Sequence, residues 1–581
     1  MKIYTDRSRI EKYQHCQRER YLEYHHPAPG SESLVGGLRP ARINLPLAVG
    51  HSVHSGLEQL LRGGQKLYDQ AGSNWDLNPK ALEWLEDKAV RQALADFEQH
   101  ASAGLELDIA EQTALGKMEQ PAYVQQLAAS LGTTLEEAGL ESLMIRAQGV
   151  RGEFEQYLAK EQAALVEAMV RAYSRRRLRP LLEQYEVLEV EQEGQWQLWE
   201  KTCPECLEEG QVFEQVFDTR MACSTCKGTG KIEGWFMSRP DALLRERATN
   251  QLYILSYKTT GAWDVRKERD AQHDMQGLSE GVEVERRLVR WWEIVTRLNQ
   301  QEPRMSVEEF SDMKKSPRML EWLKTLPAAP RILGIRYEYL LKGERWKDKE
   351  LTGRLGVECR SQRSPLIRQY VAVSEPKKGP SQYRTGDVCW SWDYIKEDGS
   401  GSSLAWQNWQ SQPVWERGAV KDWIDQLDDS QEAMSQYDST VGMEPRPLGW
   451  KSQAQALGFT AQHPLDIVFV PPIVVYRNDD DLRDWVEQAE AQEIRVAEGV
   501  AAVNGAKDES ERRHLLNVHF PMTRRACEYP STCQFVKLCY GGQDVRERPL
   551  DAGYVGRVAN HPQEQEAEQA NKIWSVSGMD M

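Results

Sequence analysis

Long apolar runs are absent from this chain of 581 residues. None of its apolar segments approaches the roughly 20 residues that a membrane-spanning helix needs. The first residues, MKIYTDRSRIEKY, also lack the apolar core of a signal peptide. A mean hydropathy of −0.65 agrees with these absences. We therefore expect a protein of the cytoplasm that has no membrane partner.

An excess of basic charge is absent as well. The chain has 73 Lys and Arg against 89 Asp and Glu, a net charge of −16. This balance excludes a non-specific nucleic-acid coat protein, because neutralising phosphates needs concentrated positive charge. It leaves room for an enzyme with a local basic cleft. Arginine-rich runs lie at 171–180 and 285–292, and each can line such a cleft or form a solvated helix face.

A nucleotide-binding loop is the third absence. The segment GTGK at 228–231 invites that interpretation, but Thr225 stands where the first glycine of a P-loop belongs. Ile232 stands where a Ser or Thr should follow the lysine. The His-Pro-Asp signature of a J domain is also missing. The chain thus carries no recognisable ATPase, and a chaperone function is not expected.

Ten cysteines without a secretion signal favour metal binding over disulfides, because a reducing compartment keeps thiols reduced. Two Cys-x2-Cys pairs, Cys203 with Cys206 and Cys223 with Cys226, are separated by sixteen residues. This spacing can bring four thiolates around one tetrahedral Zn²⁺. The second pair, in CSTCKGTGK, resembles the knuckle of DnaJ-type zinc domains, whose glycines let the backbone turn tightly around the metal. We predict a zinc site here.

A second set of cysteines lies at the two ends of the chain. Cys527, Cys533 and Cys539 are spaced Cys-x5-Cys-x5-Cys, whereas a tetrahedral site or a cubane cluster normally takes four thiolates. Cys16 is the best candidate for the fourth. Four thiolates suit zinc and a [4Fe-4S] cluster alike. Either one would join segments separated by 510 residues, which indicates a structural role.

Periodicity and turn residues predict alternating helices and strands. Helices are expected over 6–24, over 45–63 with an end at Gly63-Gly64, over 267–288 and 479–503, and as several segments between 80 and 185. Strands are expected over 185–194, 331–343 and 466–477, and as a pair at LLRE and LYILSYK. The residues after about 546 are expected to be irregular.

Several short motifs follow one another in a recognisable order. They are an early helix ending in Cys16, then GHSVHSGLE, RPDAL, ILSYKT and HDMQGLSEG, with the cysteine triplet last. This order resembles the RecB-like branch of the PD-(D/E)XK nuclease superfamily. It is most similar to members with a C-terminal iron–sulphur cluster, such as phage recombination exonucleases and CRISPR-adaptation nucleases. The resemblance selects [4Fe-4S] over zinc for the terminal cysteines.

The resemblance implies an α/β fold with a restriction-endonuclease-like core, in which a mixed central sheet is flanked by helices. The expected divisions are an N-terminal helical part and start of the core at 1–200, a zinc-knuckle insert at 201–233, the nuclease motifs at 234–300, an accessory α/β region at 301–520, a cluster segment at 521–545 and an irregular tail at 546–581.

The site residues follow from the same resemblance and from the chemistry of phosphodiester hydrolysis. That reaction uses Mg²⁺ or Mn²⁺ held by hard oxygen ligands. Asp241, at the end of the first strand of the pair, is expected to be the central metal-bridging carboxylate. His54 would add an imidazole ligand from a helix. Lys258 would orient the attacking water or neutralise the phosphate, and Gln276 would contact the site or the DNA.

One position departs from the family pattern. Ser256 stands where the family has Asp or Glu two residues before the lysine, and a neutral hydroxyl is a poor Mg²⁺ ligand. Another acid must compensate, or the activity is impaired. Glu191 and Glu58 are the candidates, and we predict Glu191. The tyrosine often found shortly after Gln276 in the family is also missing.

Two functions are therefore carried forward. The first is a metal-dependent DNA nuclease, expected to be an exonuclease, in recombination, repair or phage DNA processing, working with a separate helicase or recombination protein. The second is a weakly active or inactive nuclease-fold protein that binds DNA as a scaffold. Ser256 favours the second, whereas the retained Asp241, Lys258 and His54 favour the first.

Overall fold

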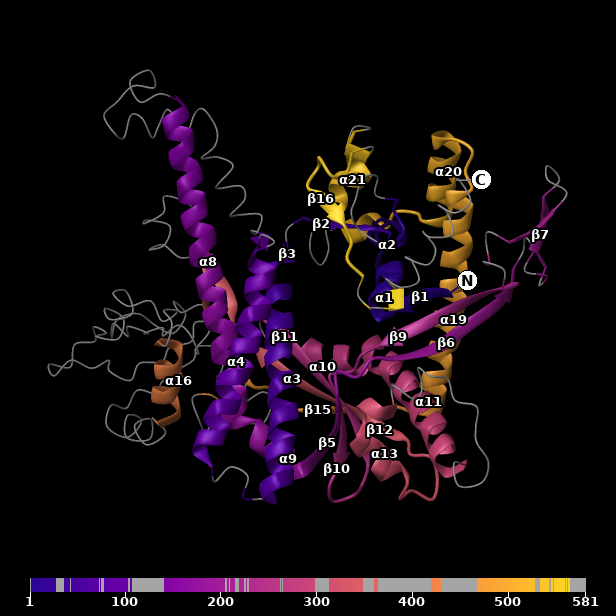
Figure 1. Ribbon diagram of the computed structural model, residues 1–581. Helices are drawn as coiled ribbons and strands as arrows, with labels where there is room; N and C mark the ends of the chain where they lie inside the picture. Colours follow the sequence, from indigo (N-terminus) through magenta and orange to yellow (C-terminus); the bar gives the residue numbers. More distant parts are fainter. Residues whose placement is uncertain are drawn as a thin grey trace.

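Helices and sheets are mixed along the chain in the computed structural model (Figure 1). The structure describes residues 2–27, 36–72, 78–102, 105–106, 140–297, 313–347, 360–363, 419–429 and 465–564, apart from short gaps within these ranges. The described part has an α/β architecture with mixed sheets, as the sequence predicted.

A five-stranded sheet forms the centre of the molecule. Its order is β15-β12-β11-β10-β5. The β11 and β12 strands pair in parallel, whereas the other three neighbouring pairs are antiparallel. The bounds are β5 Tyr185–Val190, β10 Ala242–Glu246, β11 Leu252–Thr260, β12 Ile332–Leu341 and β15 Ile473–Tyr476.

The predicted division at residue 300 cuts through this sheet. The sequence assigned 301–520 to an accessory region, but β12 and β15 are strands of the central sheet. The cause is the parallel pairing of β11 with β12, which requires a long crossover connection that sequence patterns cannot trace. The predicted strand at 466–477 is also shorter, with its ladder over Ile473–Tyr476.

Helices cover both faces of the sheet (Figure 1). On one face, Tyr257 of β11 contacts Tyr173 of α8 through their hydroxyls at 2.8 Å. On the other face, the adjacent Lys258 contacts Gln276 of α11, as expected when neighbouring strand residues point to opposite faces. The helices of the first group are α3 Leu45–Ala71, α4 Pro79–Ser102, α8 Leu140–Arg176 and α9 Leu178–Gln184; those of the second are α10 Val265–Gln272, α11 Met275–Arg297 and α13 Pro317–Leu323.

The α3 helix shows why its sequence was misjudged. Apolar residues recur every three or four positions and are buried, which makes this helix part of the main core. Gly63-Gly64, predicted to end the helix, lie inside it. A Cβ on Gly63 would lie 2.1 Å from Leu85 of α4, and one on Gly64 would lie 2.9 Å from Leu182 of α9. The two glycines therefore permit close helix packing and do not act as a stop signal.

A second, three-stranded sheet has the order β1-β9-β6. Its strands are β1 Lys2–Asp6, β6 Gly194–Thr202 and β9 Lys231–Ser238. The β6 and β9 strands form a long antiparallel hairpin that projects from the body, with the ribbon of β7 Gln211–Glu214 and β8 Thr219–Ala222 at its far end (Figure 1). The remaining short strands are β2 Leu38–Pro40, β3 Ile43–Asn44, β4 Leu105–Glu106, β13 Glu344–Lys347 and β14 Arg360–Arg363.

The predicted N-terminal helix is two helices, α1 Arg7–His15 and α2 Gln17–Tyr24. Asp6 caps α1 by accepting a hydrogen bond from the Arg9 amide at 3.0 Å. Cys16 separates the helices in an extended conformation, with φ −155° and ψ 114°. The break leaves the Cys16 side chain buried among residues from the other end of the chain.

The C-terminal part packs on these two helices. Its elements are α19 Asp479–Asn504, α20 Glu509–His519, the 3-10 turn Arg524–Cys527, α21 Val536–Tyr540 and β16 Tyr554–Gly556. The helix α16 Ala419–Asp429 lies elsewhere, against α8 (Figure 1). A small core joins Tyr21 and Leu22 of α2 to Val496, Phe520 and Phe535. The tail predicted to be irregular contains β16, which pairs with β2. Its backbone partners lie more than 500 positions earlier, beyond the reach of a local pattern.

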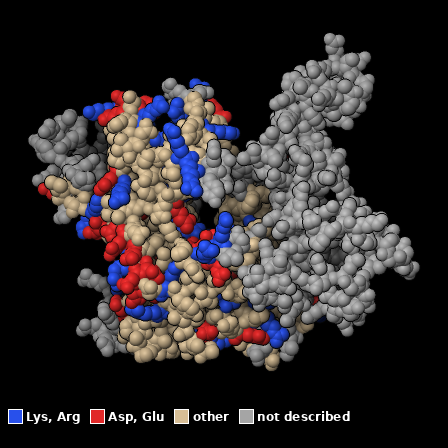
Figure 2. All heavy atoms as spheres, turned by 180° about the vertical axis from the view of Figure 1, so that it is seen from behind, with Lys and Arg blue, Asp and Glu red and all other residues tan. Residues whose placement is uncertain are grey.

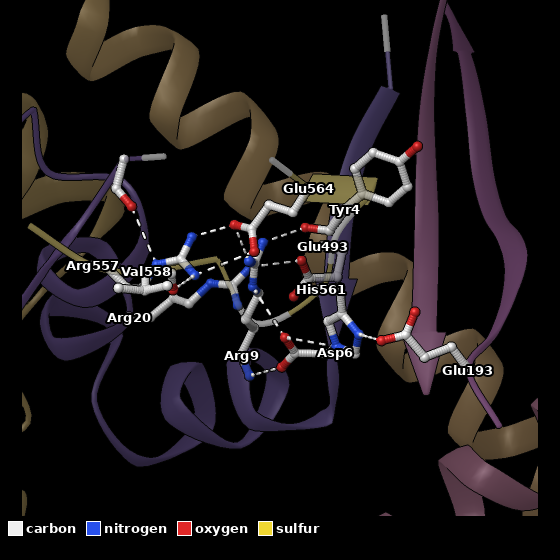
Figure 3. Close-up of polar contacts among 11 residues, drawn as sticks. Tyr4, Asp6, Arg9, Arg20, Glu193, Glu493, Arg557, Val558, His561 and Glu564 are labelled. Carbon is white, nitrogen blue, oxygen red and sulfur yellow. Dashed lines mark hydrogen bonds and ion pairs between the residues drawn. The ribbon is translucent and has the colours of Figure 1, made fainter. Parts of the chain in front are cut away.

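A buried network of charges joins the N-terminal helices to the C-terminal residues (Figure 3). Arg9 on α1 and Arg557 both pair with Glu564. Arg20 on α2 donates to Glu493 on α19 at 2.9 Å. Each of these side chains is less than one tenth exposed. The network therefore fixes both ends of the chain with matched charges inside the protein.

We expect Glu564→Ala to lower the free energy of unfolding by roughly 3–5 kcal/mol, because removing one partner leaves buried charges uncompensated. Urea unfolding followed by fluorescence measures this change. The control is Glu321→Ala, which removes an exposed ion pair with Lys324 and should cost less than about 1 kcal/mol. Equal costs for the two variants would show that the buried network does not hold the chain ends together.

Candidate active site and metal centres

Asp241 is at the centre of an acidic site. It immediately precedes β10, rather than ending a strand as predicted, and it is 8% exposed. Its Oδ1 lies 3.1 Å from Nδ1 of His54 on α3, and its Oδ2 accepts a 2.6 Å hydrogen bond from the Tyr257 amide. Burial opposes ionisation, but His54, this amide and Lys258 hold the pKa of Asp241 below its usual value. Asp241 is therefore an ionised acceptor.

The spacing of Asp241 and His54 fits a divalent cation. Two neighbouring ligands of an octahedral Mg²⁺, each about 2.1 Å from the ion, lie about 3.0 Å apart. The observed separation of Nδ1 and Oδ1 is 3.1 Å. A carboxylate with an imidazole is also a donor set that Mn²⁺ accepts. The residues present thus suit the metal that the sequence implied.

Glu191 lies beside Asp241. It follows β5 with a φ of +49°, an unusual value for a residue with a side chain. Its carboxyl group hydrogen-bonds Asp241, and its Oε2 lies 2.9 Å from Nε of Arg239. Burial and then the charge of Asp241 raise the pKa of Glu191 to about 9. Glu191 is therefore protonated at neutral pH and donates to the ionised Asp241. A bound cation would displace this proton.

Glu58, the other acid selected from the sequence, is engaged elsewhere. Its Oε1 lies 2.9 Å from Nη2 of Arg62, one turn further along α3. It is close enough to add to the raised pKa of Glu191. Of the two candidates, the structure places Glu191 against Asp241.

Lys258 and Gln276 meet at the start of α11. Nζ of Lys258 donates to Oε1 of Gln276 and lies 3.0 Å from Oδ2 of Asp274. Arg7 of α1 donates to the same Gln276 oxygen at 2.8 Å. The structure thus brings together two residues selected from the sequence and adds Arg7, which no local pattern distinguishes. Two cationic side chains beside the acidic site suit the binding of a phosphate group.

Glu280 is a buried acid that the sequence analysis missed. It lies one turn after Gln276 on α11, and its Oε1 accepts a 2.6 Å hydrogen bond from Nε2 of Gln276. Burial and then the charge of Asp241 raise the pKa of Glu280 to about 8. The spacing of four residues from Gln276 on a predicted helix was the signal that could have identified it. Glu280 therefore belongs to the same group of side chains.

The four central cysteines are buried together at the far end of the β6–β9 hairpin. The Sγ atoms of Cys203 and Cys223 are 3.7 Å apart, and those of Cys206 and Cys226 are 3.5 Å apart. Thiolates about 2.3 Å from a tetrahedral Zn²⁺ lie about 3.8 Å from one another. Among the described residues, this is the one set of three or more such ligands whose donor atoms all lie within 4.8 Å. The cysteines can therefore bind a metal such as zinc, as predicted.

A glycine turn supports this centre. The Gly230 amide donates to Sγ of Cys226 at 3.2 Å, and the Cys203 amide donates to the Gly230 carbonyl at 2.9 Å. Gly230 has a φ of +72°, which residues with side chains rarely adopt. The expectation that a glycine turns the backbone around the metal is confirmed at this position. The amide donor also orients the Cys226 sulfur.

We expect Cys206→Ser to abolish zinc binding, because a tetrahedral site loses one of its four thiolates. Elemental analysis of the purified variant measures the bound metal. Glu209→Gln is the matched control, since this exposed residue adjoins the site but supplies no ligand. Zinc retained in Cys206→Ser at the wild-type level would rule out this centre.

The terminal cysteines are brought to one region of the fold. Sγ of Cys16 accepts a hydrogen bond from the Thr523 amide at 3.5 Å, four residues before Cys527. The Cys533 amide donates to the Cys527 carbonyl at 3.0 Å, and burial raises the pKa of the Cys533 thiol to about 12. Cys16 and Cys527 both influence the pKa of Cys539, which burial raises to about 11. Metal charge would be needed to hold these thiols as thiolates.

The arginine-rich runs mostly serve the fold. Arg171 pairs with Glu86 and Glu167, and Arg175 also pairs with Glu86. In the second run, Arg287 bridges Glu189 and Glu283, and other described arginines of these runs also pair with acids or stack on aromatic rings. On the face seen in Figure 2, basic and acidic side chains are intermingled over the described surface. These runs therefore do not supply a basic cleft.

Comparisons with known proteins assign no relatives to this chain. No protein-family model matches it, and no curated protein matches it. Among the described residues, no helix combines the length and the apolar character needed to cross a membrane.

Proposed function

We propose that this protein is a metal-dependent deoxyribonuclease that hydrolyses phosphodiester bonds. The observation that supports it best is the meeting of Asp241, His54 and Lys258 beside β10 and β11. These residues come from three elements, and His54 and Asp241 are 187 positions apart in the sequence.

The side chains have distinct roles in the proposed reaction. Asp241 and His54 would hold Mg²⁺ or Mn²⁺, which lowers the pKa of a water and stabilises the leaving oxygen. Lys258 would place its positive charge beside a phosphate oxygen. Gln276 orients the lysine, because its Oε1 accepts a hydrogen bond from Nζ of Lys258. Arg7 adds a second cation on the other side of Gln276. The site is thus arranged to bind and orient a phosphodiester of DNA.

The terminal cysteines complete the proposal. Cys16, Cys527, Cys533 and Cys539 would hold a [4Fe-4S] cluster, whose four thiolates stand further apart than those around one ion because several iron atoms lie between them. Unlike the four central cysteines, these four described residues do not form a set whose sulfur atoms all lie within 4.8 Å. Amides that donate to Sγ of Cys16 and of Cys533 fit such a cluster.

Cleavage of end-labelled single- and double-stranded DNA by anaerobically purified protein tests the proposal. With Mg²⁺ or Mn²⁺, the wild type should cleave and Lys258→Ala should not, because the variant lacks the cation that faces the phosphate. Lys267→Ala, which changes a lysine on the neighbouring α10, is the control. Equal cleavage by wild type and Lys258→Ala would contradict the assignment of the site.

A DNA-binding scaffold is the second candidate function. It is favoured by Ser256, a neutral residue buried where the resemblance requires an acid. Absence of cleavage by both proteins, with DNA binding retained, would support this alternative. Both the nuclease and the scaffold would work together with a helicase or a recombination protein.

A further inference from the structure

Two buried polar groups near Lys258 lack a partner. Oγ of Ser256 is fully buried and has no hydrogen bond. Glu280 is 4% exposed, and its Oε2 is also buried without a hydrogen bond. A buried carboxylate oxygen is costly unless a donor or a cation compensates it. An unpartnered acid at this depth therefore points to a missing ligand.

Contacts along α11 show that this helix runs antiparallel to β11. At one end, Gln276 contacts Lys258. Eleven positions later, Arg287 contacts Glu189 of β5. Glu189 pairs with Leu243 of β10, which in turn pairs with Ile254 of β11, so Glu189 lies level with Ile254. Residue numbers along α11 therefore increase in the direction in which residue numbers along β11 decrease.

This register places Glu280 at the level of Ser256. Two strand residues span about 6.6 Å, and four helix residues span about 6 Å. The step from Lys258 to Ser256 therefore matches the step from Gln276 to Glu280. Ser256 also points to the same sheet face as Lys258, because side chains alternate along a strand. The unpartnered acid thus lies on the helix opposite the serine.

We propose that Glu280 supplies from α11 the metal-binding carboxylate that Ser256 does not supply from β11. Its Oε2 would move toward Asp241 and His54 to bind Mg²⁺ or Mn²⁺ with them, because the donor atoms of these three described residues do not all lie within 4.8 Å of one another. Its Oε1 would be oriented by Gln276. Its unpartnered oxygen is a hard donor of the kind these ions prefer. This inference rests on the proposed nuclease function and identifies the acid that replaces the missing one.

Other nearby acids are engaged by arginines. Glu191 pairs with Arg239, and Glu283 of α11 accepts from Arg287 at 2.7 Å. Neither has an oxygen among the buried unpartnered atoms of the described residues. Glu280 therefore replaces Glu191 as the expected compensating acid, while Glu191 remains a neighbour of Asp241.

Mn²⁺ binding to zinc-loaded protein, followed by electron paramagnetic resonance, tests the inference without relying on activity. Glu280→Gln should weaken Mn²⁺ binding about tenfold or more, because a neutral amide replaces a charged ligand. Glu285→Gln is the matched control on the same helix and should bind Mn²⁺ as the wild type does. Its carboxylate accepts from the Ile332 amide and faces away from Asp241 along the helix.

A second variant makes the test specific. Ser256→Asp in the Glu280→Gln background should restore Mn²⁺ affinity to within a fewfold of wild type, because it returns the carboxylate to the strand. Unchanged Mn²⁺ affinity in Glu280→Gln, or loss in Glu191→Gln instead, would overturn the inference while DNA cleavage by the wild type upheld the nuclease. A wild type with neither Mn²⁺ binding nor cleavage would overturn both.

Discussion

Asp241→Asn is expected to reduce metal-dependent DNA cleavage by at least about a hundredfold, since metal stabilisation of the transition state contributes several kcal/mol and each 1.4 kcal/mol is about tenfold in rate. The amide retains an oxygen that can accept from the Tyr257 amide, so the local fold has a replacement for that hydrogen bond. What it lacks is the negative charge facing His54. Single-turnover cleavage at saturating Mg²⁺ measures the effect.

The control for Asp241→Asn is a variant that keeps the negative charge but changes its position. Asp241→Glu retains a carboxylate but displaces its oxygens, and therefore should also lose most cleavage while binding Mn²⁺ better than Asp241→Asn does. Thermal unfolding of each variant establishes that the fold persists. Cleavage by Asp241→Asn within a fewfold of wild type would remove Asp241 from the proposed centre.

If the proposed iron–sulphur cluster is present, Cys16→Ser is expected to remove its chromophore and to destabilise the C-terminal part. A cross-link that closes a loop of some 500 residues restricts the unfolded chain by on the order of 5 kcal/mol. For a protein of this size, that corresponds to a fall in Tm of roughly 4 °C. The absorption of the anaerobic protein and differential scanning calorimetry measure the two effects.

The outcome at Cys16 also separates cluster from zinc. A brown wild-type protein that contains iron and sulphide would support the cluster. A colourless protein that carries a second zinc would show that the terminal cysteines bind zinc instead. Cys206→Ser is the matched thiol control, because it should lose zinc and keep the iron. A Cys16→Ser protein that retains both colour and Tm would exclude Cys16 as a ligand.

Local sequence patterns were sufficient where spacing determines geometry. The Cys-x2-Cys pairs led directly to the buried thiol centre, because four ligands on two tight turns have few ways to meet. His54, Asp241 and Lys258 were selected through motif order, and the structure places them together.

The features that the sequence did not predict depend on contacts between residues far apart in the chain. Gly63-Gly64 indicated a helix end, but Leu85 and Leu182 approach so closely that only glycine fits inside the helix. Glu280 was missed because its burial depends on how α11 lies across the sheet. Arg7 was missed because Gln276, its partner, is 269 positions away. Apart from the four-residue spacing of Gln276 and Glu280, these contacts leave no local signal.

The pairing of Arg9 with Glu564 also has a consequence during synthesis. The two residues are 555 positions apart, so at 5–20 residues per second the arginine waits roughly 30 to 110 s for this partner. Strand β1 must likewise wait for β9, on which it depends for its ladder. These early residues are thus secured only after much of the chain has followed them. Until then their future contact surfaces are open to chaperones and proteases, which gives the cell time to remove an unfinished chain.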